Sequence, residues 1–495
     1  MPRSKNFLPT KKKTKHKAIV PSTIDEYLAA GVEFEEAGEK WRCGDVEKSI
    51  RFSMRALNCY SEALTKFPSA FDLAYNKARL QYELTQHPKI IEKIPGTPNE
   101  LLKTALEYSR YALALNPNSP DILFNTAQVL TSIVEDLDGS NESCDSDPIK
   151  LLEEALALFQ KCLHIQENMI QEQNLYTAEV EGSDDYMGEN NEEGGVSIAT
   201  TIPKSTSMEM DPCGDRWARV IESVTQDTLL DTVLASIETL TSLSQLINPQ
   251  NSEALFSVQK YASSITSKLE DYLTNKERIS EAFITRASFQ CAFATAQFRC
   301  SHIDLSTFSR VTYNAYSDID LSESPRGLCE CAESFISYNT SLRQSSDDHN
   351  DETLHMRWKA LTWASEHLTA ASKLSAAENT EKIHLTRGDV ELLRYQLGQV
   401  EGGISIAKAS STVLLRNADK FYRGSASIAR NKGMQRVAKE AALKGTIALG
   451  LIGEPGELER VDNFDSLTVT MIEEAIEDGL VTTTQLMRLG VDIIS

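Results

Sequence analysis

The sequence predicts an all-α protein, a solenoid of helical hairpins with long insertions between some of its helices. Three observations support this prediction. Over most of the 495 residues, apolar side chains recur three and four positions apart, which is the period of one face of an α-helix. Glycine and proline interrupt helices and are few, with 23 and 15 in the whole chain. A spacing of small residues, a larger residue and proline also recurs, as is typical of stacked helical repeats.

The recurring spacing places small residues where two antiparallel helices cross. Small residues let the helices approach closely, the residue between them fills the gap, and proline ends the second helix before the next one begins. Only the third copy lacks the proline. The copies are Ala56-x3-Tyr60-x2-Ala63-x4-Pro68, Ala105-x3-Ser109-x2-Ala112-x4-Pro117 and Ala155-x3-Phe159-x2-Cys162.

These copies resemble the tetratricopeptide repeat (TPR), most clearly in the segment ALEYSRYALALNPNSPDILFNTAQVL at residues 105–130. The resemblance covers about residues 27–165 and implies antiparallel helix pairs stacked into a solenoid. In the family the two small residues of one repeat lie about 12 positions apart, but here they lie 18, 27 and 28 apart. We therefore expect the extra residues, which include 87–103 and 138–148, to loop out or to lengthen helices. The small residues of the first helices would be Gly38, Ala78 and Ala127.

The chain is predicted to divide into four parts. They are a disordered basic tail (1–21), TPR-like helical repeats (22–173), an acidic disordered linker (174–215) and a divergent α-helical repeat region (216–495). The linker loses the helical period and is rich in Gly, Ser, Asn and acidic residues, so it cannot bury much apolar surface. In the last part we expect helical stretches, interpreted as divergent helical hairpins that continue the solenoid, at 279–298, 325–343, 354–375, 380–397, 404–449 and 467–489.

Charge is concentrated in two segments of the chain. The whole chain has 50 basic and 72 acidic residues, a net charge of −22. Residues 1–17 carry seven cations and no acid, whereas residues 111–215 carry 21 acids and three lysines. The tail fits a nuclear-import signal or an arm that contacts a polyanion, and the alternative is a solvated tail without function. Its import-like residues are Lys11, Lys12, Lys13, Lys15 and Lys17.

Composition argues against several classes of protein. No stretch approaches the roughly 20 uncharged apolar residues of a membrane-spanning helix, and the first residues lack the apolar core of a secretory signal. An acidic chain is not an ordinary nucleic-acid binder. The nine cysteines are scattered and contain no C-x-x-C pair, so we expect reduced thiols that mostly fill the core. We therefore predict a protein of the nucleus or the cytoplasm that contacts neither membranes nor nucleic acid directly.

No motif predicts catalysis, a metal or a cofactor. The segment Gly398–Gly403 (GQVEGG) lacks the spacing of a phosphate-binding loop and indicates the end of a helix. Two other groups, Cys329 with Cys331 and Asp347–Glu352 with His355, lack the paired ligand spacing of a zinc site. An enzyme is therefore only the third choice among function classes.

The TPR resemblance also implies a binding groove, because in that family the first helix of each repeat lines a concave surface. One TPR subclass binds a chaperone's C-terminal carboxylate through Lys, Arg and Asn, but here Glu35 and Glu39 stand at matching positions, so such a ligand is disfavoured by charge. The acids favour a basic segment, and the aromatic residues would add cation–π contacts. The alternative is that several of these residues are solvated helix faces. The implied groove residues are Glu35, Glu39, Asp72, Tyr75, Tyr82, Asp121 and Phe124.

These features predict a non-enzymatic TPR-like adaptor for protein–protein interaction. Its specific version is an escort chaperone for a basic nuclear or ribosomal client, whose charge the acidic segment 111–215 would screen. The alternative is a structural scaffold subunit of a stable multiprotein complex, in which the acidic segment is only a connector.

Overall fold

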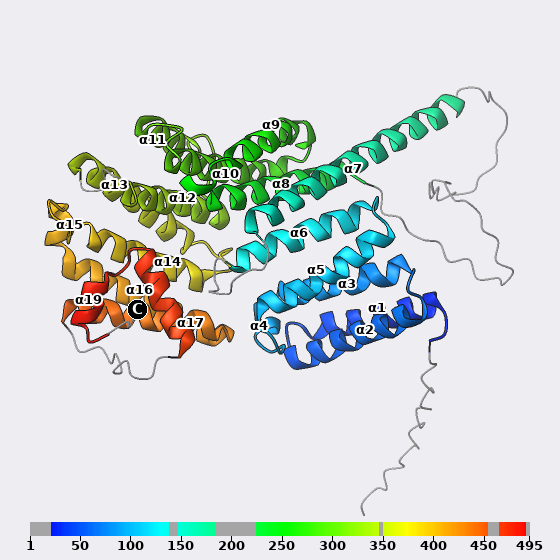
Figure 1. Ribbon diagram of the computed structural model, residues 1–495, viewed down its shortest axis with the longest axis horizontal. Coiled ribbons are helices and arrows are strands. Elements are labelled where there is room, and N and C mark those ends of the chain that lie inside the picture. Colours follow the sequence, from blue (N-terminus) through cyan, green and yellow to red (C-terminus); the bar gives the residue numbers. More distant parts are fainter. Residues whose placement is uncertain (1–20, 138–146, 185–223, 346–349, 454–464, 492–495) are drawn as a thin grey trace, which may run out of the picture. The chain divides into compact units, whose positions relative to one another are not determined.

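All regular secondary structure in the described residues is helical, which confirms the predicted all-α class (Figure 1). The chain divides between Pro117 and Asn118 into two compact units. This boundary falls inside the predicted repeat region, and the four-part division by sequence stays a prediction. The lysines of the basic tail lie outside the described residues. The computed structural model describes residues 21–137, 147–184, 224–345, 350–453 and 465–491.

The first unit contains α1 (Ile24–Trp41), α2 (Val46–Lys66), α3 (Phe71–Thr85), α4 (Pro88–Ile91) and α5 (Pro98–Leu115). α1 pairs with α2, α2 packs against α3, and α3 pairs with α5. Capping side chains satisfy backbone N–H groups where three of these helices begin, and thereby fix those starts. The caps are Thr23 for α1, Asp45 for α2 and Thr97 for α5.

The recurring spacing fills the interfaces of these hairpins. In the first two copies, the small residues and the residue between them are at most 1% exposed. Burying a ring such as that of Tyr60 removes a large apolar surface from water, which stabilises the hairpin by about 2 kcal/mol. The buried residues are Ala56, Tyr60, Ala63, Ala105, Ser109 and Ala112.

The extra residues between Ala78 and Ala105 form helix in part and loop in part. α3 continues to Thr85, the short α4 follows, and α5 already begins at Pro98. Between α4 and α5 the backbone turns at Gly96, whose φ of 112° favours glycine. The expected insertion is thus a helical turn, a short loop and the start of α5.

The second unit contains the remaining helices. α6 pairs with α7, α12 with α13, and α16 with both α14 and α17, while α8 packs against α7, α9 and α10. Their bounds are α6 (Pro120–Leu137), α7 (Pro148–Asp184), α8 (Gln226–Leu246), α9 (Ala254–Tyr272), α10 (Ile279–Arg299), α11 (Leu305–Asn314), α12 (Pro325–Arg343), α13 (Asp351–Ala371), α14 (Thr380–Gln396), α15 (Ser405–Ala409), α16 (Ser411–Lys432), α17 (Gln435–Ile452), α18 (Ser466–Glu477) and α19 (Thr483–Arg488).

Several helix ends differ from the predicted ones. α7 continues to Asp184, into the segment predicted as a linker, because glycine and proline are absent between residue 174 and Gly182. The helical stretch predicted at 404–449 contains α15, α16 and α17, with Gly433 directly after α16, and the stretch predicted at 467–489 contains α18 and α19, with Gly479 between them. Both glycines have positive φ, 80° and 75°, which ends a helix in the left-handed conformation. Gly402, in the predicted helix-end segment between α14 and α15, also has a positive φ, of 70°.

A glycine of one helix receives a tyrosine ring of its partner helix in each unit. A Cβ on Gly31 would lie 2.2 Å from the Tyr60 ring, and a Cβ on Gly388 would lie 2.4 Å from the Tyr422 ring. The Tyr60 hydroxyl donates to Glu35 at 2.6 Å, as the Tyr422 hydroxyl does to Asp389 at 2.7 Å.

The second of these tyrosines belongs to a further copy of the spacing that sequence reasoning missed. Ala418-x3-Tyr422-x2-Ser425 follows the same pattern as the first three copies, and all three residues are fully buried. Gly31 accommodates the Tyr60 ring, and Gly38, the predicted small residue of this helix, is buried against Ser53 of α2. The repeat therefore returns near the end of the chain.

Replacing Gly31 with alanine is expected to lower the free energy of unfolding of the first unit by about 1–3 kcal/mol, because the new methyl group overlaps a fully packed ring. Urea unfolding followed by far-UV circular dichroism measures the change. Gly44→Ala is the matched control, since nothing lies within 4 Å of a Cβ at that turn. Equal midpoints for the two variants would contradict the tight glycine–tyrosine contact.

Candidate functional site

The groove residues implied by the resemblance lie on three helices of two units. Glu35 and Glu39 are on α1, and Asp72, Tyr75 and Tyr82 are on α3, all in the first unit. Asp121 and Phe124 are on α6 in the second unit. Glu35 contacts α3 through Arg79, whereas Asp121 and Phe124 belong to the other compact unit.

Glu35 points into an ion-pair network between α1 and α3. One carboxylate oxygen accepts the Tyr60 hydroxyl, and the other pairs with the Arg79 guanidinium of α3. Arg79 also pairs with Glu83 at 3.2 Å, and Glu83 pairs with Arg42 at 2.6 Å. Two glutamates and two arginines thus balance one another around a cavity of about 70 Å³.

Burial and neighbouring charges set the protonation states in this network. Burial, together with the hydrogen bond to Glu35, raises the pKa of Tyr60, so its hydroxyl remains a donor. Burial lowers the pKa of His87, and Arg42, whose guanidinium lies 2.9 Å from the imidazole Nε2, lowers it further. The carboxylate of Glu35 is therefore committed to contacts inside the unit, and its charge is neutralised there.

Glu39 has a different environment from Glu35, although both lie on α1. Its side chain is 73% exposed and lies 4.0 Å from Arg42. Glu39 belongs to an exposed side of the helix on which acids surround Val32, itself 41% exposed. We define the acidic face of α1 as these residues: Asp25, Val32, Glu33, Glu36 and Glu39.

The aromatic residues of the implied groove contribute mainly to packing. Tyr75 lies against Phe71 with ring centroids 5.9 Å apart, and Phe124 meets Phe159 edge-on at 5.4 Å. Tyr82 is half-buried on α3. The rings of Tyr75 and Phe124 are thus partly covered within their own units.

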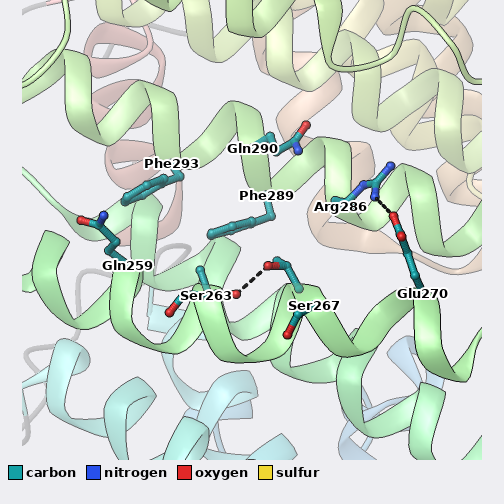
Figure 2. Close-up of a pocket in the computed structure, with 10 residues that line it drawn as sticks. Gln259, Ser263, Ser267, Glu270, Arg286, Phe289, Gln290 and Phe293 are labelled. Carbon is teal, nitrogen blue, oxygen red and sulfur yellow. Dashed lines mark hydrogen bonds and ion pairs between the residues drawn. The ribbon is translucent and has the colours of Figure 1, made fainter.

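A second hollow, which sequence reasoning did not find, lies between α9 and α10 in the second unit (Figure 2). It is an open groove of about 540 Å³. Phe289 and Phe293 of α10 stack in it at 5.8 Å, opposite Ser263 and Ser267 of α9. One signal in the sequence is Gln259, which stands ten residues after Pro249. The residues ten after Pro68 and Pro117 are the small residues Ala78 and Ala127.

The walls of this groove combine small polar residues with one ion pair. Gln259 and Gln290 are exposed on its two helices, and Arg286 pairs with Glu270 at 3.1 Å. Because the cation and the anion neutralise each other, the groove offers an aromatic floor and amide groups rather than a net charge.

Other reactive groups are placed as core residues. Burial raises the pKa of the Cys162, Cys291 and Cys331 thiols, each to about 12, so they stay protonated at neutral pH. In the part of the chain that the structure describes, no three His, Cys, Asp or Glu side chains are grouped to bind a metal ion. Within the same residues, no helix combines the length and apolarity that crossing a bilayer requires.

Comparison with known proteins finds relatives of unassigned activity. No family model matches the chain. UPF0656 protein C926.02 of Schizosaccharomyces pombe is 24% identical over 470 residues, which cover 92% of this chain and 94% of that protein. The uncharacterized protein YNL193W of Saccharomyces cerevisiae is 27% identical over 158 residues, 27% of this chain and 28% of its own. A solved circular tandem repeat protein with a novel repeat topology has 12% identity and a TM-score of 0.28, covering 94% of both chains.

Replacing Glu35 with glutamine is expected to lower the free energy of unfolding by about 1–3 kcal/mol, because it removes the charge that balances a half-buried Arg79. Thermal unfolding by circular dichroism measures the effect. Glu39→Gln is the matched control on the same helix, with an expected change within about 0.5 kcal/mol for an exposed acid. If both variants unfold alike, Glu35 is not committed to the network.

Proposed function

We propose that this chain is a non-enzymatic adaptor for protein–protein interaction, TPR-like in its first hairpins, which escorts a basic nuclear or ribosomal client. The observation that carries the proposal is the acidic face of α1. Four carboxylates lie there within one exposed helix surface, and Val32 at its centre is available for an apolar contact.

The burial of the ion-pair network supports this choice of surface. Because Glu35 is neutralised by Arg79, the negative potential of the first hairpin comes from the residues that point outward. Exposed carboxylates arranged along a helix attract a cationic segment at long range and are screened by salt. This behaviour suits a client that is bound during transport or assembly and is later released.

Reversing three charges of this face tests the proposal. Glu33→Lys, Glu36→Lys and Glu39→Lys together are expected to weaken binding of a fluorescent lysine- and arginine-rich peptide about tenfold, since each exposed pair contributes about 0.5 kcal/mol. Fluorescence anisotropy at low and at physiological salt measures the affinity. Circular dichroism checks that the helices are retained.

The matched control moves the same amount of charge elsewhere on the surface. Glu107→Lys, Glu172→Lys and Glu401→Lys change three exposed acids in three other helices or turns. The control is expected to lower affinity less than twofold. An equal loss in both triple variants would mean that only the net charge of −22 attracts the peptide, which would contradict a defined site on α1.

A second candidate function, a scaffold subunit of a stable complex, is favoured by the groove between α9 and α10. Its aromatic floor is accompanied by Phe256 of α9, whose side chain is 75% exposed. Apolar surface of this kind is typically covered in a permanent assembly. In that case the chain would be a permanent subunit of one large complex and would not bind a transient client.

Size-exclusion chromatography of native lysate separates the two functions. A scaffold is expected to elute in a large assembly that resists high salt, and Phe256→Ser is expected to release it as a smaller species. Met487→Ser, which changes another exposed apolar side chain, 56% exposed, is the control and should leave the assembly intact. Elution that shifts with salt but not with Phe256→Ser contradicts the scaffold and agrees with the client escort.

A further inference from the structure

The segment around α16 and α17 has the opposite charge to the rest of the chain. Residues 402–453 contain nine lysines and arginines and two acids, although the chain as a whole carries −22. Neither the acidic face of α1 nor the groove between α9 and α10 includes these residues. This local excess therefore requires its own explanation.

The cations of α16 gather on one side of the helix. They follow one another at intervals of four, three and seven residues, which places them along a single exposed surface of a helix with 3.6 residues per turn. The opposite side of α16 is buried through Ala418, Tyr422 and Ala426. We define the basic stripe of α16 as its exposed residues Arg416, Lys420, Arg423 and Arg430.

The two acids of the segment are directed into the protein. Asp419 is 2% exposed and pairs with Arg423, whose own side chain remains 73% exposed. Glu440 pairs at 2.8 Å with Lys444, which is 5% exposed on α17. The acids thus stabilise the helix packing, while the surface of α16 keeps a positive charge.

Other cations of the segment are already paired with acids from outside it. Lys432 pairs with Glu381 of α14 at 2.6 Å, and Lys439 pairs with Asp465 at 2.6 Å. Both side chains are partly buried, and Lys439 lies on α17, so neither belongs to the stripe. What distinguishes the stripe is its position on the exposed side of one long helix.

The surroundings of the stripe indicate which kind of anion fits it. Val413 lies one turn before Arg416 and is 60% exposed, and Ile406 on the neighbouring α15 is 56% exposed. The aromatic residue Phe421 lies to the side, half-buried, with the Arg387 guanidinium 4.0 Å from its ring centroid. Aliphatic side chains next to cations suit an amphipathic peptide, whereas single-stranded nucleic acid needs exposed aromatic rings on which bases stack.

We propose that the basic stripe of α16 binds an acidic, partly aliphatic segment of a protein partner. Carboxylates of the partner would pair with the stripe, and an aliphatic side chain would cover Val413. This surface goes beyond the proposed client site, because it has the opposite charge and belongs to the other compact unit. An adaptor with both surfaces would connect a basic client to an acidic partner.

The test uses the full chain and a fluorescent synthetic peptide of alternating glutamate and leucine. Arg416→Glu, Lys420→Glu and Arg430→Glu together are expected to weaken its binding about tenfold, measured by anisotropy. Arg423 is kept because it pairs with buried Asp419. Val413→Ser alone is expected to weaken binding about threefold, and a glutamate–serine peptide should bind more weakly than the glutamate–leucine one.

Matched controls and competing probes decide the outcome. Lys103→Glu, Lys276→Glu and Lys373→Glu reverse three exposed lysines outside the stripe and should change the affinity less than twofold. A single-stranded RNA that binds the stripe more tightly than the peptide would overturn the proposal in favour of nucleic acid. A dimer of this chain abolished by the stripe variant would overturn it in favour of a second copy. Absence of peptide binding, or equal loss in both triple variants, would also overturn it.

Discussion

The rest of the structure depends on one constraint, the close approach of paired helices. A glycine that faces a tyrosine ring makes this approach possible. Gly31 with Tyr60 and Gly388 with Tyr422 allow a separation that any side chain would prevent. Each tyrosine is then fully buried, so its hydroxyl needs an acceptor. A carboxylate of the glycine-bearing helix provides it, and that carboxylate in turn needs a cation. The glycine–tyrosine contact thus leads to a buried carboxylate, and that carboxylate pairs with a cation from a third helix.

The third helix supplies a different cation in each unit. Arg79 of α3 meets Glu35, and Lys444 of α17 meets Asp389 at 3.2 Å. Burial raises the pKa of Asp389, but Lys444 acts against that change. Such pairs contribute little net stability, because desolvation offsets their attraction, but removing one partner leaves an isolated charge. They consequently hold the third helix against the hairpin. They also determine which acidic side chains remain on the surface.

Sequence periodicity and spacing were sufficient to predict the helical class and the buried positions of the first three repeats. They could not separate Glu35 from Glu39, because residues four apart share a helix face and only Arg79, 44 positions away along the chain, makes the difference. The groove between α9 and α10 could not be located from the sequence, because its existence depends on the distance between two helices. The basic stripe, by contrast, could have been found by counting charges between 402 and 453.

The net charge of −22 therefore describes the surface of this protein poorly. Attraction between a charged molecule and this surface depends on the exposed charges within about 10 Å of it, because that is the Debye length at moderate salt. Glu35 and Asp419 contribute to the formal total but are neutralised inside the protein, whereas Glu39 and Lys420 point outward. The exposed charges form an acidic face on α1 in one unit and a basic stripe on α16 in the other. A charged molecule that approaches either surface responds to that local charge rather than to the net charge of the whole chain.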